Sequence, residues 1–180
     1  MSIRMATAGD IPRILEIYGY YVENTTVSFE YTVPTLEAFT QRFEKITAFF
    51  PWLVWEEEGC VLGYAYGSRA FERAAYQWSA SASIYLCGEA RGRGIGRKLY
   101  AALENILKEQ GYRRVYAVIT TGNEDSLAFH RAVGYRHTAT MENIGYKFGN
   151  WYGTVWMEKD LNTWDAPPRP PISVHQLPGM

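Results

Sequence analysis

Apolar residues recur along this chain with two periods, one typical of helices and one typical of strands. Apolar positions spaced by three and four residues predict helices over 11–22, 36–46, 95–110 and 124–133. Short apolar runs rich in aromatic and β-branched residues predict strands over 3–6, 52–57, 61–68, 78–86, 115–119, 135–142 and 154–159. Because strands and helices alternate in this order, we expect an α/β domain with a mixed sheet.

Residues that begin and end helices stand at the edges of these patterns. Asp10, Thr35 and Asn123 precede helical patterns, and their side-chain oxygens can accept hydrogen bonds from the free N–H groups of a first turn. Gly111 and Gly134 follow helical patterns, where glycine readily adopts the left-handed conformation that ends a helix. These five positions fix the predicted helix boundaries.

Length and proline content predict one domain followed by a tail. A chain of 180 residues is long enough for a single domain with a substantial core. Five of the eight prolines lie between Pro167 and Pro178, and proline neither pairs inside a sheet nor continues a helix. We therefore predict a domain over residues 1–161 and a Pro-rich tail over 162–180, lying on the surface or disordered.

Charge and cysteine content narrow the function classes. The formal net charge of −1 gives no support to nucleic-acid or membrane-surface binding, and no apolar run is long enough to span a membrane. Cys60 and Cys87 follow an N-terminus without a secretory signal pattern, so we expect reduced, buried thiols and a cytoplasmic location. His130, His137 and His175 lack the spacing of metal ligands, so no metal is expected.

A short glycine-rich turn, Arg91-Gly92-Arg93-Gly94-Ile95-Gly96, joins a strand pattern to the 95–110 helix pattern. Its glycines let backbone N–H groups approach an anion closely, and the following helix N-terminus adds partial positive charge. The spacings of a P-loop and of an N-terminal dinucleotide-binding motif are absent. The turn is therefore predicted to hold a pyrophosphate; an ordinary solvated loop is the alternative.

This turn resembles that of the GNAT superfamily of acetyl-CoA-dependent N-acetyltransferases, whose pattern is Arg/Gln-x-x-Gly-x-Gly, and residues 123–135 match that superfamily as well. The resemblance implies the GNAT fold, a central and mostly antiparallel mixed sheet flanked by helices. A narrower resemblance, to the phosphinothricin N-acetyltransferase family, covers nearly the whole chain. It is carried by Thr26–Phe29, Pro51–Val54, Ala75–Trp78, Gly145–Trp151 and Pro167–Pro170.

The resemblance implies acetyl-CoA as co-substrate and indicates its binding residues. In GNAT proteins the pantetheine arm pairs with the fourth strand like an added strand. The pyrophosphate lies at the glycine-rich turn, and the start of the next helix also contacts the cofactor. The matching residues are Ile84, Tyr85 and Leu86 for pantetheine, Arg91, Gly92, Arg93, Gly94, Ile95, Gly96 and Arg97 for pyrophosphate, and Asn123 and Ser126 at the helix. For Asn123, a plain N-cap is the alternative role.

His130 and Ser81 occupy the positions that the resemblance implies for catalysis. The family carries a histidine at the place of His130, and an imidazole titrates near neutral pH; the alternative is a helix-face histidine bonded to a carbonyl. Relatives usually place a glutamate, the favoured general base, where this chain has Ser81. Serine alone accepts no proton at neutral pH. Either waters held by Ser81 and Ser83 carry the amine proton toward Glu30 or His130, or the substrate differs from the family's usual one.

The 69–76 loop is expected to bind substrate. Relatives use basic residues here to hold the carboxylate of an amino acid, which a guanidinium does through two parallel hydrogen bonds. The resemblance implies Arg73 first and Arg69 second, with Phe29 and Tyr76 as walls of the pocket. A solvated charged loop is the alternative for the arginines.

Lys147 and Tyr152 lie in a segment that relatives present to a neighbouring subunit near the pocket mouth. This implies a homodimer and lets Lys147 meet a second anionic group, such as a phosphinate. The alternative for Lys147 is a solvated hairpin lysine. Trp151 and Trp156 agree with a dimer surface, because aromatic residues are enriched in interface cores, but they also suit a protein core.

Three functional hypotheses follow. The first is transfer of acetyl from acetyl-CoA to the α-amino group of a small amino acid, such as phosphinothricin, methionine sulfoximine or another glutamate analogue, directly in a ternary complex. The second keeps the chemistry but changes the acceptor to another small amine or a protein N-terminus. The third is an acyl-CoA-binding regulatory module without turnover, for which Ser81 is the only positive sign.

Overall fold

Seven strands form one sheet, in the order β1-β2-β3-β4-β5-β7-β6, within residues 1–179, the part of the chain that the computed structural model describes. The strands are β1 (Ser2–Met5), β2 (Trp52–Glu57), β3 (Cys60–Arg69), β4 (Ser79–Leu86), β5 (Arg114–Thr120), β6 (Arg136–Lys147) and β7 (Asn150–Asp160). The helices are α1 (Ile11–Asn24), α2 (Leu36–Thr47), α3 (Ile95–Gln110) and α4 (Glu124–Ala132). Neighbouring strands are antiparallel except β4 and β5, which are parallel. The predicted mixed, mostly antiparallel α/β architecture is confirmed.

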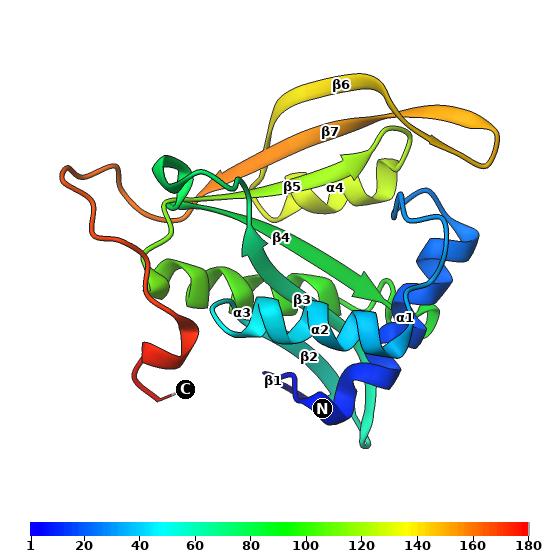
Figure 1. The fold of residues 1–180 in the computed structure, drawn as a ribbon, viewed down its shortest axis with the longest axis horizontal. Helices are drawn as coiled ribbons and strands as arrows, with labels where there is room; N and C mark the ends of the chain where they lie inside the picture. The colour runs from blue at the N-terminus through cyan, green and yellow to red at the C-terminus, as the bar shows by residue number, and fades with distance from the viewer. Residues whose placement is uncertain (180) are drawn as a thin grey trace.

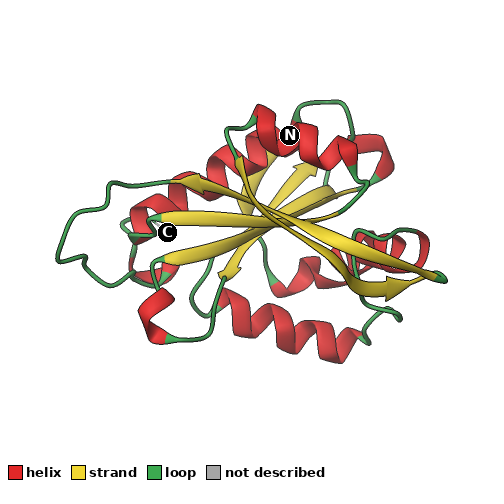
Figure 2. Ribbon diagram, turned by 90° about the horizontal axis from the view of Figure 1, so that it is seen from above, coloured by secondary structure: helices red, strands yellow, loops and turns green. Residues whose placement is uncertain are grey.

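The helices cover both faces of the sheet (Figures 1 and 2). α1 and α2 pack on one face around Trp52, Val54 and Tyr64. α3 and α4 pack on the other face, where Ile95, Leu99, Leu103 and Leu107 of α3 are buried as their spacing predicted, and Ile106 is partly buried. Gly111 ends α3 with a φ of 99°, a conformation that glycine adopts without steric penalty.

Two of the three predicted N-caps are confirmed. The Thr35 side chain accepts from the Ala38 N–H, and the Asn123 side chain accepts from the Ser126 N–H, both at 3.2 Å. Asp10 stands at the N-cap position of α1, as predicted, but its carboxylate does not accept a hydrogen bond from the first turn. It accepts instead from the Thr7 N–H and from the Arg4 guanidinium, which contacts it at 2.7 and 2.8 Å.

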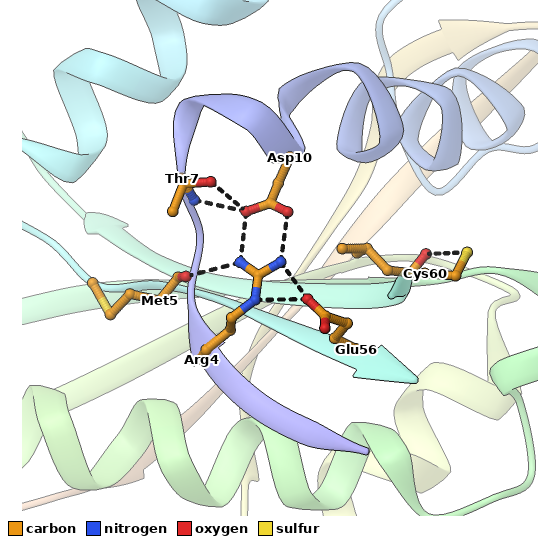
Figure 3. A network of polar contacts seen from close by, with 7 residues as sticks. Arg4, Met5, Thr7, Asp10, Glu56 and Cys60 are labelled. Carbon is orange, nitrogen blue, oxygen red and sulfur yellow. Dashed lines mark hydrogen bonds and ion pairs between the residues drawn. The ribbon is translucent and has the colours of Figure 1, made fainter. Parts of the chain in front are cut away.

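Arg4 connects three elements through its guanidinium (Figure 3). One edge of the group meets Asp10, and another meets Glu56 on β2. The Arg4 hydrogen bond is the main cause that lowers the pKa of Asp10 to about 2. The network therefore fastens β1 and the start of α1 to the edge of the sheet.

β4 and β5 lie side by side at their beginnings and then diverge (Figure 1). β4 pairs with β3 from Arg69↔Ala80 to Gly63↔Leu86. Its pairing with β5 ends at Ser81↔Tyr116. Among residues 1–179, the second half of β4 therefore has a strand on one side only.

The β6–β7 hairpin extends beyond the rest of the sheet (Figure 1). The predicted strands over 135–142 and 154–159 were too short, because β6 continues to Lys147 and β7 begins at Asn150. Much of β6 is exposed on both sides, so its second half lacks the clear alternation of apolar and polar residues that predicts a strand.

The Pro-rich segment is docked on the domain. The Ile172 N–H donates to Gln110 O and the Val174 N–H donates to Phe49 O, and Val174 and Leu177 are buried. Within the described part of the segment, residues 174–176 form a short 3₁₀ turn, so the prediction that it could not wind was too strict. Met180, the last residue of the predicted tail, lies outside the described residues.

Candidate active site

A hollow opens where β4 and β5 diverge. It is lined by residues 82–85 of β4, residues 117–120 of β5 and side chains from α3 and α4. Five predicted site residues are brought together there: Ile84, Tyr85, Asn123, Ser126 and His130. Val27, Tyr100 and Thr120 also line it and were missed. Tyr100 follows the buried Leu99 in the sequence, so its apolar neighbours concealed its place at the hollow.

The free edge of β4 presents backbone groups to a ligand. The Cys87 N–H donates to Leu62 O at 2.9 Å, so position 87 is bonded to β3. Hydrogen-bonding direction alternates along an antiparallel strand, so Ile84 and Leu86 direct their N–H and C=O groups away from β3. This is the side where an extended ligand can add as a strand.

The glycine-rich turn leads from this edge to the N-terminus of α3. Gly92 and Gly94 have φ values of 72° and 76°, and open space surrounds the position of a Cβ at each. Gly94 precedes α3 without a side-chain cap, so the N–H groups of the first turn remain available to an anion. These features fit a pyrophosphate group. Gly96 is a glycine for a different reason, close packing: a Cβ there would lie 3.3 Å from the side chains of Ile84 and Phe129.

The arginines of the turn are held in different ways. Arg91 donates to the Tyr21 hydroxyl at 3.1 Å, and Arg93 binds both carboxylate oxygens of Glu57 at 2.8 and 2.9 Å. Arg97 lies exposed on the first turn of α3. The Arg93 side chain therefore anchors the turn to β2. If Arg93 contacts a phosphate as predicted, its backbone N–H is the group that does so. Cofactor contact at this turn stays a prediction.

His130 is buried between α4 and α3. Its Nδ1 lies 2.7 Å from Ser126 O, and its Nε2 lies 3.0 Å from the Tyr100 hydroxyl. A carbonyl only accepts, so Nδ1 carries the proton and Nε2 accepts from Tyr100 in the neutral ring. Burial lowers the pKa of His130, while the Ser126 carbonyl opposes that shift. His130 is therefore held neutral, with both ring nitrogens partnered.

Ser81 lies at the point where β4 and β5 separate. It stands opposite Ser68 of β3 and Tyr116 of β5 in the last paired position. Ser83, two residues further along β4 on the same face, lines the hollow. The structure thus brings Ser83 to the hollow and places Ser81 just beyond its end.

The predicted carboxylate-binding residues lie at the other end of β3 and β4. Arg69 ends β3 and donates to Glu72 O at 3.3 Å, and Arg73 precedes a short 3₁₀ turn at Ala74–Tyr76. Tyr76 is 48% exposed and packs against Phe71. These residues are near one another in the fold but do not line the hollow.

Lys147 is buried, and the structure contradicts its predicted contact with a substrate anion. Its ammonium donates to Val22 O, Thr25 O and Ser28 O at 2.6, 2.9 and 2.7 Å. These bonds use all three N–H groups, so the lysine fastens the hairpin to the segment after α1. The solvated-lysine alternative is also wrong, because the residue is only 2% exposed.

Phe29 and Tyr152 lie in or beside the same hairpin. The Phe29 ring packs over Gly145, where a Cβ would come within 2.3 Å of it. Tyr152 is half-buried on β7, opposite Gly145 in the strand register. Both residues therefore lie near the segment after α1 that Lys147 binds, and their contact with substrate stays a prediction.

Within residues 1–179, no group of three or more His, Cys, Asp or Glu side chains is arranged to hold a metal ion. None of the described helices has the length and apolar character needed to cross a bilayer.

Comparison with known proteins identifies the family. Residues 3–156 match the model of the acetyltransferase (GNAT) domain. Phosphinothricin N-acetyltransferase from Streptomyces viridochromogenes is 34% identical over 98% of this chain and 96% of its own length. An L-methionine sulfoximine/L-methionine sulfone acetyltransferase from Pseudomonas aeruginosa is 35% identical over 89% of this chain and 95% of its own.

A solved structure supports the same family assignment. The phosphinothricin acetyltransferase from Sinorhizobium meliloti in complex with acetyl-CoA has a TM-score of 0.88 and 37% identity, covering 94% of this chain and 92% of that one. The predicted superfamily, fold and co-substrate are thereby confirmed. The chain belongs to the GNAT acetyltransferase family and is an acetyl-CoA-dependent N-acetyltransferase.

Proposed function

We propose that the enzyme acetylates the α-amino group of a small amino acid related to glutamate, such as phosphinothricin or methionine sulfoximine, in a ternary complex. The curated relatives named for these substrates match nearly the full chain, which supports this substrate class. The main structural support is the free edge of β4, which runs from the hollow beside His130 to the glycine-rich turn and can pair with the cofactor. Acetyl-CoA supplies an activated acetyl thioester.

Direct transfer fits the positions of the cysteines. Cys60 is exposed at the start of β3, and Cys87 is partly exposed and follows β4 beyond the residues that line the hollow, so the prediction that both thiols are buried is wrong. Neither thiol stands where it would receive the acetyl group beside Ile84. The amine is therefore proposed to attack the thioester carbon itself, which forms the amide bond and releases the thiolate.

Glu30 is the proposed end of the proton route from the amine. One carboxylate oxygen binds Arg42 at 2.5 Å, and the other is buried and has no hydrogen-bond partner among residues 1–179. Val27, three residues earlier, lines the hollow. The alternative acceptor, His130, already has both nitrogens bonded. We expect Glu30→Gln to lower kcat at least tenfold, an effect typical of a lost general base, whereas Glu109→Gln on the exposed side of α3 leaves kcat unchanged.

We also propose that the enzyme is a homodimer and is located in the cytoplasm. The β6–β7 hairpin exposes Ile144, Phe148 and Trp151, whose exposed fractions are 53, 56 and 63%. Large apolar side chains grouped on one projecting element are typical of a protein interface. Sedimentation equilibrium should give twice the chain mass for the enzyme and a lower mass for Trp151→Glu; a single-chain mass for the unmodified enzyme would contradict the dimer.

Thiol release from acetyl-CoA tests the substrate class. The purified protein is assayed with phosphinothricin, methionine sulfoximine, ordinary amino acids, polyamines and a peptide with a free N-terminus. We expect preference for the glutamate analogues, with KM raised about tenfold or more in Arg73→Ala and partly restored in Arg73→Lys. Lys108→Ala, which removes an exposed cation at the far end of α3, is the control. Preference for a polyamine or peptide would contradict the proposal.

A further inference from the structure

The hydroxyl of Tyr21, near the end of α1, is bonded to the free edge of β4. It donates to Leu86 O at 2.6 Å and accepts from the Leu86 N–H at 3.3 Å. It also accepts from Arg91 Nη2 at 3.1 Å. One proton and two lone pairs are thereby all used.

These partners are the groups that a ligand needs at this place. The N–H and C=O of Leu86 face away from β3, so they are available for pairing with an extended amide chain. Arg91 is the first cation of the glycine-rich turn, where it can bind a phosphate oxygen. A single hydroxyl therefore holds two backbone groups and one guanidinium of the predicted cofactor site.

Two hollows follow β4, and Tyr21 lines the second of them. The first is lined by residues 82–85 and the second by residues 86–88 together with Ile17, Tyr20 and Tyr21 of α1. The Tyr21 side chain forms part of the wall of the second hollow. The ring is 8% exposed, and the Arg91 guanidinium lies 5.4 Å from its centroid.

We infer that Tyr21 is a latch on the acetyl-CoA site. Its hydroxyl bonds both the N–H and the C=O of Leu86 and accepts from Arg91, and its two bonds to Leu86 must break when pantetheine pairs with the strand edge. The hydrogen bonds that Tyr21 gives up offset part of the binding free energy. Tyr21 is thus a positioning residue that lowers cofactor affinity, an inference that rests on acetyl-CoA as co-substrate and is independent of the acceptor amine.

Calorimetric titration of acetyl-CoA into the full-length enzyme, without amine, tests the latch. Tyr21→Phe keeps the ring and removes the hydroxyl, and we expect it to lower Kd at least about threefold, the effect of losing one or more competing hydrogen bonds. Tyr20→Phe is the matched control, because its neighbouring ring is 54% exposed and its hydroxyl contacts neither Leu86 nor Arg91. An unchanged or higher Kd in Tyr21→Phe would overturn the inference.

A second measurement needs no variant. In the unmodified enzyme labelled with ¹³C at the tyrosine ring, the Cζ signal of Tyr21 should shift on addition of acetyl-CoA, because its hydroxyl changes partners. The signal of Tyr31, which binds Tyr146 O on the distant hairpin, should stay in place. A Tyr21 signal that does not move at saturating acetyl-CoA would overturn the latch. Failure of the proposed amino-acid substrate would affect neither experiment.

Discussion

The Tyr100 hydroxyl lies 3.0 Å from Nε2 of His130, across the interface between α3 and α4. Because Nδ1 of the same ring donates to Ser126 O, this contact fixes His130 in one tautomer. The Nε2 atom is then an acceptor, so the neutral ring has no N–H to offer a ligand in the hollow. A role for His130 as proton donor would first require Tyr100 to release it.

Replacing Tyr100 by Phe should raise the pKa of His130 and leave its tautomer unchanged, because Nδ1 still donates to Ser126 O. The hydroxyl stabilises the neutral ring by donating to Nε2, so its loss should raise the pKa of His130 toward the ordinary value. Nitrogen-15 NMR of the imidazole, recorded between pH 5 and 8, measures both properties. The unmodified enzyme should show the Nδ1–H tautomer. An Nε2–H signal there, or the same pKa in Tyr100→Phe, would contradict this geometry.

Gly94→Ala should weaken acetyl-CoA binding for a reason other than stability. Gly94 and Gly59 have almost equal positive φ values, 76° and 77°, and open space around each, so alanine should cost about 1 kcal/mol of unfolding free energy at either position. Only Gly94 precedes the helix that we expect to hold the pyrophosphate. Calorimetry should therefore give a higher Kd for Gly94→Ala and an unchanged Kd for Gly59→Ala. Equal effects on Kd would rule out a special role for the turn.

Lys147→Met should destabilise the fold. The substitution leaves three carbonyls of the segment after α1 without their donor, at a cost of about 3 kcal/mol. For a chain of this size, Tm should fall by about 10 °C. Lys108→Met, at an exposed position, should leave Tm within about 1 °C. A normal Tm with a raised substrate KM would instead restore the predicted anion contact.

Stability near pH 3 should depend on Asp10. Its pKa is lowered to about 2 in the folded protein, so at these pH values the unfolded chain binds more protons and stability rises with pH. The contribution, about 2 kcal/mol, is nearly complete above about pH 5 and is lost as pH falls toward 2. Urea unfolding should therefore separate the unmodified enzyme from Asp10→Asn at pH 6 and bring them together near pH 2. Glu109→Gln, on the exposed side of α3, should show no such convergence.

Local rules predicted much of the fold. Thr35 and Asn123 begin their helices and Gly111 ends α3, because capping depends on groups only a few residues away. Asp10 fails the same rule because Arg4 competes for its carboxylate from a neighbouring strand. A local pattern therefore predicts a cap only where no charged partner arrives from elsewhere in the chain.

The contacts that shape the site join residues far apart in the sequence. Tyr21 and Leu86 are 65 positions apart, and Lys147 lies more than 100 positions from its three carbonyls. The divergence of β4 from β5 depends on how the strands pair, which hydrophobic spacing does not encode. The resemblance to a family located the hollow and the glycine-rich turn, but the partners of Tyr100 and Lys147 required the structure.

The most direct test of the central claim is the identity of the product formed from ¹³C-labelled acetyl-CoA and L-methionine sulfoximine, read by NMR. The account predicts one acetyl group, bonded to the α-nitrogen, with free coenzyme A formed in equal amount. Hydrolysis of acetyl-CoA without an amide product, or its tight binding without turnover for every amine tested, would contradict it.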